Sequence, residues 1–229
     1  MTKHIGIVAC SAEGASLCYR TICVEGADIL GGHAHPEVSM HTPSLAEYVV
    51  CLERGDWDGV ADLMLASAEK LAAIGADFLI SPDNTIHQAF AQVEARSPLP
   101  WIHIADVVAI EALAQGYRRL AITGTRWLVA SGVYPERLAA SGLEFQRPDT
   151  DEALEIDRII MDELVRSRFE ARSTERVIAI IDRMKHDGCD AVVLGCTELP
   201  LIIDDRNAPM PVLDSTRLLA RAALARATK

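Results

Sequence analysis

Two stretches decide the fold of this chain: residues 75–85 read Gly-Ala-Asp-Phe-Leu-Ile-Ser-Pro-Asp-Asn-Thr, and residues 188–198 read Gly-Cys-Asp-Ala-Val-Val-Leu-Gly-Cys-Thr-Glu. Both follow an amphipathic helical stretch, and both run from Gly-x-Asp through an apolar segment into a short polar turn. They lie about half the length of the chain apart. The chain is therefore predicted to contain two homologous halves. In each half a buried strand ends at one reactive side chain, Asp83 or Cys196.

Apolar periodicity predicts the same alternation of strands and helices in both halves. Strands are expected at His4–Ala9, Phe78–Ile80, Trp101–Ile104, Arg119–Ile122 and Ala191–Leu194, and helices between them include Trp127–Ala140 and Glu152–Ser167. Short apolar strands that alternate with helices indicate parallel sheets covered on both faces. The predicted fold class is α/β, with two pseudo-symmetric subdomains at residues 1–105 and 106–213. The closing helix, residues 214–229, is expected to pack back on the first subdomain.

In parallel sheets, ligands bind beyond the carboxyl ends of the strands. Here those positions are rich in polar side chains, namely Ser11, Asp83-Asn84-Thr85, Thr123-Gly124-Thr125 and Cys196-Thr197-Glu198. Such residues commonly cap helices by accepting hydrogen bonds from backbone N–H groups. Together, four such ends also supply N–H donors suited to a carboxylate. Capping and carboxylate binding therefore both stay open at this point.

Composition excludes several classes of function. The chain has 229 residues, of which 50% are hydrophobic and 24% charged, so it can bury a sizeable core. Its 22 Lys and Arg residues against 33 Asp and Glu give a net charge of −11, which disfavours nucleic-acid partners. No stretch approaches the roughly 20 apolar residues of a membrane span, and the apolar run Ile5–Ala9 is too short for a signal peptide. A cytoplasmic protein is expected. The six cysteines show no zinc-ligand spacing, so no metal site is predicted.

Four segments carry a resemblance to a known family. They are the turns Asp83-Asn84-Thr85-Ile86-His87 and Gly195-Cys196-Thr197-Glu198-Leu199-Pro200, the opening His4-Ile5-Gly6-Ile7-Val8 and the central Ile122-Thr123-Gly124-Thr125. Along nearly its whole length the chain resembles the aspartate/glutamate racemase superfamily, which also includes hydantoin racemase, maleate isomerase and arylmalonate decarboxylase. The resemblance implies an enzyme without a cofactor, commonly a homodimer, with its active site in the cleft between two α/β subdomains.

The sequence departs from the superfamily pattern at the first turn. There the superfamily has Cys-Asn-Thr, and two thiols remove and return a proton on opposite faces of the substrate carbon. Here Asp83 replaces the first cysteine. Because aspartate commonly caps helices, both a catalytic role and a capping role stay open for Asp83. The superfamily cation that holds the distal carboxylate of aspartate falls at Leu45. A second basic residue falls at Arg166, which equally suits a solvated helix end.

The resemblance implies catalytic roles for Cys196 and Asp83 on opposite faces of a small carboxylate substrate. A thiol at a helix N-terminus is expected to be shifted toward thiolate. His87 either orients Asp83, touches the substrate or is structural. The substrate-binding residues implied are Ser11, Asn84, Thr85, Thr125, Thr197, Glu198 and Arg166.

Three functions follow in order of preference. The first is a racemase or epimerase of an acidic amino acid. The second is a decarboxylase or isomerase of a small dicarboxylate with one working thiol. The third is a carboxylate-binding protein without catalysis.

Overall fold

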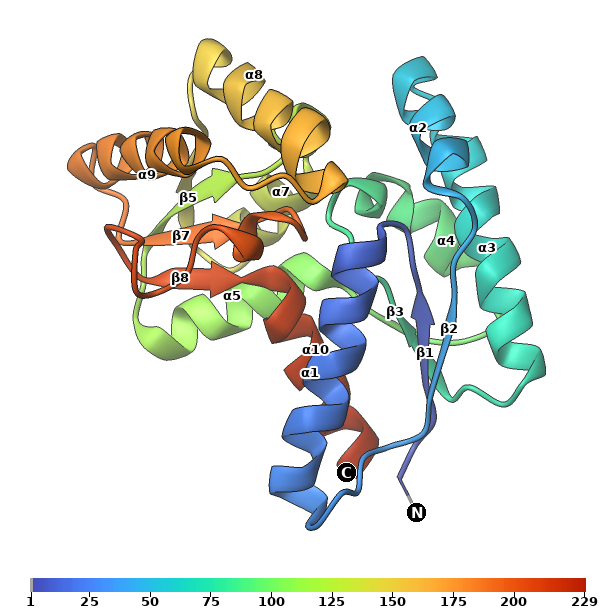
Figure 1. Ribbon diagram of the computed structural model, residues 1–229. Helices are drawn as coiled ribbons and strands as arrows, with labels where there is room; N and C mark the ends of the chain where they lie inside the picture. Colours follow the sequence, from blue (N-terminus) through green and yellow to red (C-terminus); the bar gives the residue numbers. More distant parts are fainter. Residues whose placement is uncertain (1) are drawn as a thin grey trace. The chain divides into compact units, whose positions relative to one another are not determined.

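The computed structural model describes residues 2–229 and divides into two compact units. Unit 1 holds the residues up to Ile104 together with Thr216–Lys229, and unit 2 holds Ala105–Ser215. Each unit contains a four-stranded parallel sheet flanked by helices (Figure 1). The predicted α/β class is confirmed. None of the helices in the described residues is long and apolar enough to cross a bilayer.

The two sheets have the same strand order, which is the structural form of the sequence repeat. Sheet A runs β2-β1-β3-β4 and sheet B runs β6-β5-β7-β8. The elements of unit 1 are β1 (Ile5–Val8), α1 (Ala12–Leu30), β2 (Val38–His41), α2 (Leu45–Arg54), α3 (Trp57–Ala73), β3 (Phe78–Ile80), the 3₁₀ helix η1 (Thr85–Ala89), α4 (Phe90–Arg96), β4 (Trp101–Ile102) and α10 (Ser215–Thr228). Those of unit 2 are α5 (Ile104–Gln115), β5 (Arg119–Thr123), α6 (Arg126–Ala130), α7 (Val133–Ala140), β6 (Glu144–Gln146), α8 (Thr150–Arg158), the π-helical η2 (Ile159–Glu163), the 3₁₀ helix η3 (Leu164–Arg166), α9 (Ala171–His186), β7 (Ala191–Leu194), the 3₁₀ helix η4 (Leu199–Leu201) and β8 (Val212–Asp214).

The glycine of each Gly-x-Asp motif ends the preceding helix. Gly75 follows α3 with φ of 91°, and Gly188 follows α9 with φ of 98°. These left-handed conformations strain any residue with a Cβ atom, so glycine is the residue that ends both helices. Each helix therefore stops at the same point before its strand, and this part of the repeat is structural.

The aspartate of the motif fixes the start of the neighbouring strand. In unit 1 the Asp77 carboxylate accepts from the backbone N–H of His4 at 2.6 Å, and Asp77 N donates back to His4 O at 2.8 Å. In unit 2 the Asp190 carboxylate accepts from Arg119 N at 3.1 Å, and Asp190 N donates to Arg119 O at 2.9 Å. The two halves thus use one device to set the register of their central strands.

The closing helix α10 belongs to unit 1. Figure 1 shows α10, in red, beside α1, in blue, and Arg221 of α10 makes a two-bond ion pair with Glu25 of α1 at 2.8 and 2.9 Å. The guanidinium of Arg226 lies over the Phe78 ring, 4.7 Å from the ring centroid. These contacts attach the last helix to the face of sheet A on which Phe78 lies.

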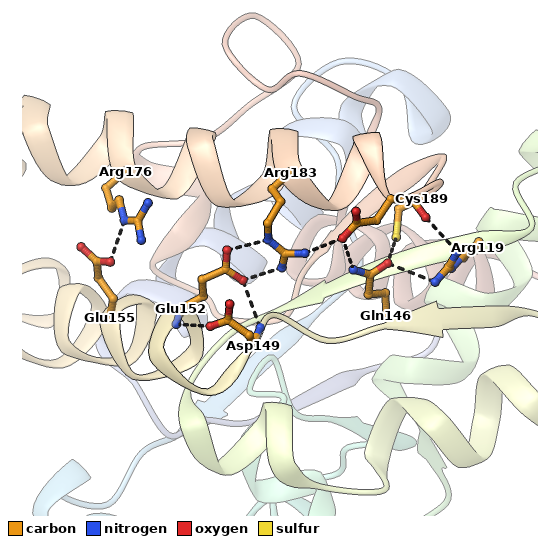
Figure 2. A network of polar contacts seen from close by, with 9 residues as sticks. Arg119, Gln146, Asp149, Glu152, Glu155, Arg176, Arg183 and Cys189 are labelled. Atoms are coloured by element: carbon orange, nitrogen blue, oxygen red, sulfur yellow. Dashed lines mark hydrogen bonds and ion pairs between the residues drawn. The ribbon is translucent and has the colours of Figure 1, made fainter.

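In unit 2 a polar network joins the two helices that follow β6. Arg183 of α9 donates to Glu152 of α8, through Nε at 2.6 Å and through Nη2, and also donates to Asp187 at 2.5 Å (Figure 2). Gln146 of β6 donates to Asp187 at 2.9 Å and accepts from Arg119 at 3.1 Å. The network therefore connects α8 and α9 to the edge of sheet B.

Two expected helices differ in the structure, and one strand was not expected. The helix predicted at Trp127–Ala140 is two helices, α6 and α7, because the Ser131 hydroxyl donates to Leu128 O at 2.7 Å and accepts from Val133 N at 3.3 Å, which ends one helix and starts the next. The helix predicted at Glu152–Ser167 passes from α through π to 3₁₀ geometry. Strand β8 was not predicted, because its three residues are too few for a periodic signal.

Candidate active site

The candidate site residues of unit 1 lie at the carboxyl edge of sheet A. Ser11 follows β1 and caps α1, since its hydroxyl accepts from Gly14 N at 3.3 Å. Asp83, Asn84 and Thr85 follow β3; Asn84 and Thr85 are buried, and Asp83 is half-buried. One edge of the sheet therefore gathers these four predicted residues.

The Asp83 side chain makes a capping contact. Its Oδ1 accepts from Ile86 N at 3.2 Å. The element that it caps begins as the 3₁₀ helix η1 and becomes α-helical only at Phe90. Capping by Asp83 is thus observed. One carboxylate has about four lone-pair sites, so this bond does not occupy the group.

His87 holds the backbone of the Asp83 turn. Its Nδ1 is 2.6 Å from Asp83 O, and its Nε2 is 3.3 Å from Ile104 N. A carbonyl only accepts and a backbone N–H only donates, so the imidazole is neutral with its proton on Nδ1. The ring is buried, stacks on Phe90 at 5.4 Å between centroids and meets His103 edge-on at 4.7 Å. His87 therefore contacts the Asp83 turn through the main chain, and its role toward Asp83 or a substrate stays a prediction.

Cys196 lies at the carboxyl end of β7, and its thiol is hydrogen-bonded to a carboxylate. Cys196 Sγ donates to Glu198 Oε2 at 3.0 Å, and Thr197 Oγ1 donates to the same oxygen at 2.7 Å. All three side chains are buried, with exposed fractions of 6%, 2% and 4% for Cys196, Thr197 and Glu198. The arrangement places a proton acceptor against the thiol in a site from which water is largely excluded.

The reason expected for thiolate character at Cys196 is wrong. The turn leads into η4, which is three residues of 3₁₀ helix and not an α-helix. So short an element carries little of the aligned dipole that favours an anion. The group that acts on the Cys196 proton is instead the carboxylate of Glu198. Its side chain was predicted as a substrate contact, and the structure shows it bonded to the thiol.

Two glycines allow the carboxyl ends of β5 and β7 to approach each other closely. Gly195 N donates to Thr123 O at 2.9 Å, and a Cβ on Gly195 would stand 2.6 Å from that oxygen. A Cβ on Gly124 would stand 2.9 Å from Gly195 O. Only glycine permits this approach. The neighbouring Thr125 caps α6, since its hydroxyl accepts from Leu128 N at 3.2 Å, so Thr125 and Cys196 belong to adjoining turns.

The basic residues of unit 2 are placed differently from one another. Arg166 ends η3 and is exposed. Arg126 was missed by sequence reasoning, although it directly follows Thr125: its guanidinium lies 4.5 Å from the Trp127 ring centroid, and its Nε is 3.7 Å from the buried Asp157 carboxylate. Its position directly after a polar strand end was the signal by which the sequence could have identified it.

Within residues 2–229 no group of three or more His, Cys, Asp or Glu residues is placed to hold a metal ion.

The chain belongs to the Asp/Glu/hydantoin racemase family, whose sequence profile matches residues 7–223. The broad-specificity amino-acid racemase RacX of Bacillus subtilis is 22% identical over 167 residues, which cover 73% of this chain and 72% of RacX. The family resemblance inferred from the turn motifs is confirmed. Amino-acid racemase activity, and with it the isomerase class, is supported.

Solved structures agree with this assignment. A candidate Asp/Glu racemase from Yersinia pestis has a TM-score of 0.90 and 29% identity, covering 99% of this chain and 100% of that one. An aspartate racemase homologue from Pyrococcus horikoshii has a TM-score of 0.83 and 28% identity, covering 100% of both chains. A glutamate racemase from Francisella tularensis in complex with D-glutamate shares the fold at a TM-score of 0.70 and 13% identity, covering 98% of this chain and 80% of that one.

Proposed function

We propose that the chain is a cofactor-independent racemase or epimerase of an acidic amino acid, resembling aspartate or glutamate, with Cys196 and Asp83 acting on opposite faces of the α-carbon. The observation that carries the proposal is the buried thiol of Cys196 held 3.0 Å from the Glu198 carboxylate. A spectator cysteine needs no such partner, because buried cysteines usually behave as small apolar side chains. Family membership supplies the reaction class.

The reaction needs one base and one acid at a time. In one direction Asp83 takes the α-proton, the electron pair moves onto the substrate carboxylate as an enediolate, and the Cys196 thiol returns a proton to the other face of the carbon. This leaves Asp83 protonated and Cys196 as thiolate, which is the pair that the reverse direction requires. Every proton is accounted for, and no redox step occurs. Donors around the enediolate lower its energy. The proposed donors are the hydroxyls of Thr85 and Thr125 and the backbone N–H groups beside Thr197.

Glu198 serves Cys196 in this proposal. A carboxylate is a weaker base than a thiolate, so the resting form is the thiol hydrogen-bonded to Glu198, ready to deliver its proton. When Cys196 acts as base from this resting form, Glu198 takes the thiol proton and the thiolate then removes the α-proton. After the sulfur has delivered a proton back to the carbon, Glu198 returns its proton to the sulfur. The bond from Thr197 to the same oxygen fixes the rotamer of the carboxylate. Asn84, Ser11 and Arg166 complete the proposed substrate contacts.

One observation favours a second candidate. The Asp83 carboxylate caps η1 through Ile86 N at 3.2 Å, and a cap needs no catalytic role. If Asp83 only caps, Cys196 is the single working acid, as in a decarboxylase or isomerase of a small dicarboxylate.

The family resemblance also supports a homodimer located in the cytoplasm as the proposed working form. Light scattering on a size-exclusion column tests the oligomeric state.

The test is an NMR screen in deuterated buffer with acidic amino acids and substituted malonates. A racemase incorporates deuterium at the α-carbon, and Cys196→Ser abolishes that signal. Cys189→Ser is the matched control, because Cys189 is also a buried thiol of unit 2, hydrogen-bonded at 3.6 Å to Gln146. Carbon dioxide release from a malonate would establish the second candidate instead. Binding without exchange or release would leave a carboxylate-binding protein.

A further inference from the structure

Tyr48 of α2 carries a buried hydroxyl without a partner. The side chain is 0% exposed, and its hydroxyl oxygen has no hydrogen-bond partner within residues 2–229. Leaving a buried polar group unsatisfied costs about 1–3 kcal/mol. Buried hydroxyls in folded proteins are nearly always bonded, so an exception calls for a ligand, a water or a functional reason.

The position of Tyr48 supplies the functional reason. Helix α2 follows β2, which lies beside β1 in the parallel sheet, so its first turns stand at the carboxyl edge. The charges of Cys10 and Asp83 act on the Tyr48 hydroxyl, as do those of the neighbouring Glu47 and Cys51. Cys10 and Asp83 are the residues next to the ends of β1 and β3. The hydroxyl therefore belongs to the Asp83 half of the candidate site.

A second unsatisfied hydroxyl lies at the same edge. Ser81 is 0% exposed, and its Oγ also has no partner among the described residues. Leu79 faces Leu71 of α3, because a Cβ on the opposing Gly6 would meet both side chains. Side chains alternate along a strand, so Ser81 lies on the same face as Leu79, the face that α3 covers, and α2 packs against α3. Two buried hydroxyls without a partner among the described residues, one of them within the electrostatic influence of Asp83, indicate a site that a polar ligand completes.

The chemical state of Tyr48 limits what it can do. Burial, followed by the charges of Cys10 and Asp83, raises the pKa of the Tyr48 hydroxyl far above its ordinary range. The phenol therefore keeps its proton at every pH at which the protein works. It is a hydrogen-bond donor and not a base. The groups that it can serve are oxygen atoms that carry or gain negative charge.

We propose that the Tyr48 hydroxyl is a catalytic hydrogen-bond donor that binds the substrate carboxylate beside Asp83 and stabilises the enediolate formed when the α-proton leaves. This inference rests on the proposed function. In the step concerned, Asp83 takes the proton from the α-carbon, the electron pair moves onto the carboxylate, and an oxygen of the resulting enediolate accepts from the Tyr48 O–H. Tyr48 keeps its proton throughout. Its bond strengthens as charge grows, which is the condition for accelerating the reaction.

Tyr48→Phe isolates this role, because it removes one oxygen and preserves the buried ring. We expect kcat/KM for α-proton exchange to fall by about 10- to 100-fold, with the thermal midpoint unchanged or raised, since an unsatisfied polar atom has been removed. Tyr134→Phe is the thermal control. Tyr134 is equally buried, but its hydroxyl is hydrogen-bonded to Ser215, so the same change should lower its midpoint.

The outcomes separate this inference from the proposed function. Wild-type exchange that Tyr48→Phe leaves intact overturns the role of Tyr48 and leaves the racemase standing. A lower thermal midpoint for Tyr48→Phe overturns it too, because the hydroxyl would then have a structural partner. If the wild type exchanges no α-protons, the proposed function fails. Thermal shifts with aspartate, glutamate and malonate then decide whether the Tyr48 hydroxyl binds a carboxylate. A shift that Tyr48→Phe loses supports the binding contact; an equal shift, or none in the wild type, overturns it.

Discussion

Replacing Asp83 by asparagine separates its two possible roles. Asparagine caps helices as well as aspartate does, so the bond from Ile86 N to the side chain at 3.2 Å survives in Asp83→Asn. The bond from His87 to Asp83 O at 2.6 Å also survives, because it uses the main chain. Only the basicity of the carboxylate is lost. If Asp83 is a catalytic base, exchange on its face should fall by about 10²- to 10⁴-fold, the usual contribution of acid–base catalysis.

Asp83→Ala supplies the matched comparison. It removes the base and the cap together, and loss of a cap costs about 1 kcal/mol, which lowers the thermal midpoint by about 2–4 °C in a chain of this size. Asp83→Asn should therefore melt like the wild type yet exchange as slowly as Asp83→Ala. The assay is deuterium incorporation from each enantiomer, followed by NMR beside a thermal melt.

The two enantiomers should differ in the unmodified protein. In water an aspartic acid side chain titrates near about 3.9 and a cysteine thiol near about 8.5, so a thiolate is much the stronger base. The face that Cys196 serves should exchange faster, and Asp83→Cys should narrow the difference by supplying a second thiol. Equal exchange from both enantiomers, unchanged in Asp83→Asn, would refute the reasoning and leave Asp83 a cap.

Three further outcomes are expected. Glu198→Gln should lower exchange by about 100-fold, because the neutral amide can accept a hydrogen bond from Cys196 but cannot take up its proton. Arg183→Met should lower the free energy of unfolding by about 2 kcal/mol, measured in urea, because it leaves the buried Glu152 carboxylate unpaired. Burial and then the charge of Lys70 hold the pKa of His41 below its ordinary 6.5, so the unfolded chain binds the proton more readily. The stability should fall as the pH drops below about 6.5, and less so in His41→Gln.

Each of these outcomes has its own control. Wild-type exchange in Glu198→Gln would show that Cys196 needs no base partner. Arg176→Met breaks the more exposed pair with Glu155, in which the Arg176 and Glu155 side chains are 46% and 34% exposed, and should cost less than 1 kcal/mol, about the value of surface ion pairs. A larger loss there than at Arg183 would contradict the burial argument. An identical pH profile for His41→Gln and the wild type would exclude His41 as the group that titrates.

Sequence reasoning succeeded where the signal is local and periodic. The Gly-x-Asp repeat, the apolar strands and the polar turns at residues 83–85 and 196–198 all lie within short windows, and they define the α/β class and the family. Sequence reasoning failed where the hydrogen bonds of a few residues decide where a helix ends or which type of helix forms. Ser131 divides one predicted helix in two through its hydroxyl, and the turn after Cys196 forms a 3₁₀ helix and not an α-helix. Neither feature alters the apolar periodicity of the sequence, so the periodicity could not predict them.

The sequence by itself determined the two-fold repetition and the four polar strand ends, and it identified Asp83 and Cys196 as the candidate pair. Tertiary structure alone decided how those groups are held. His87 is joined to Ile104, Arg221 of the last helix to Glu25, and the Tyr48 hydroxyl is buried at the Asp83 edge. Such contacts join residues far apart in the chain and depend on which rotamer each side chain takes. Periodicity records only which face of an element is apolar, so it carries no information about them.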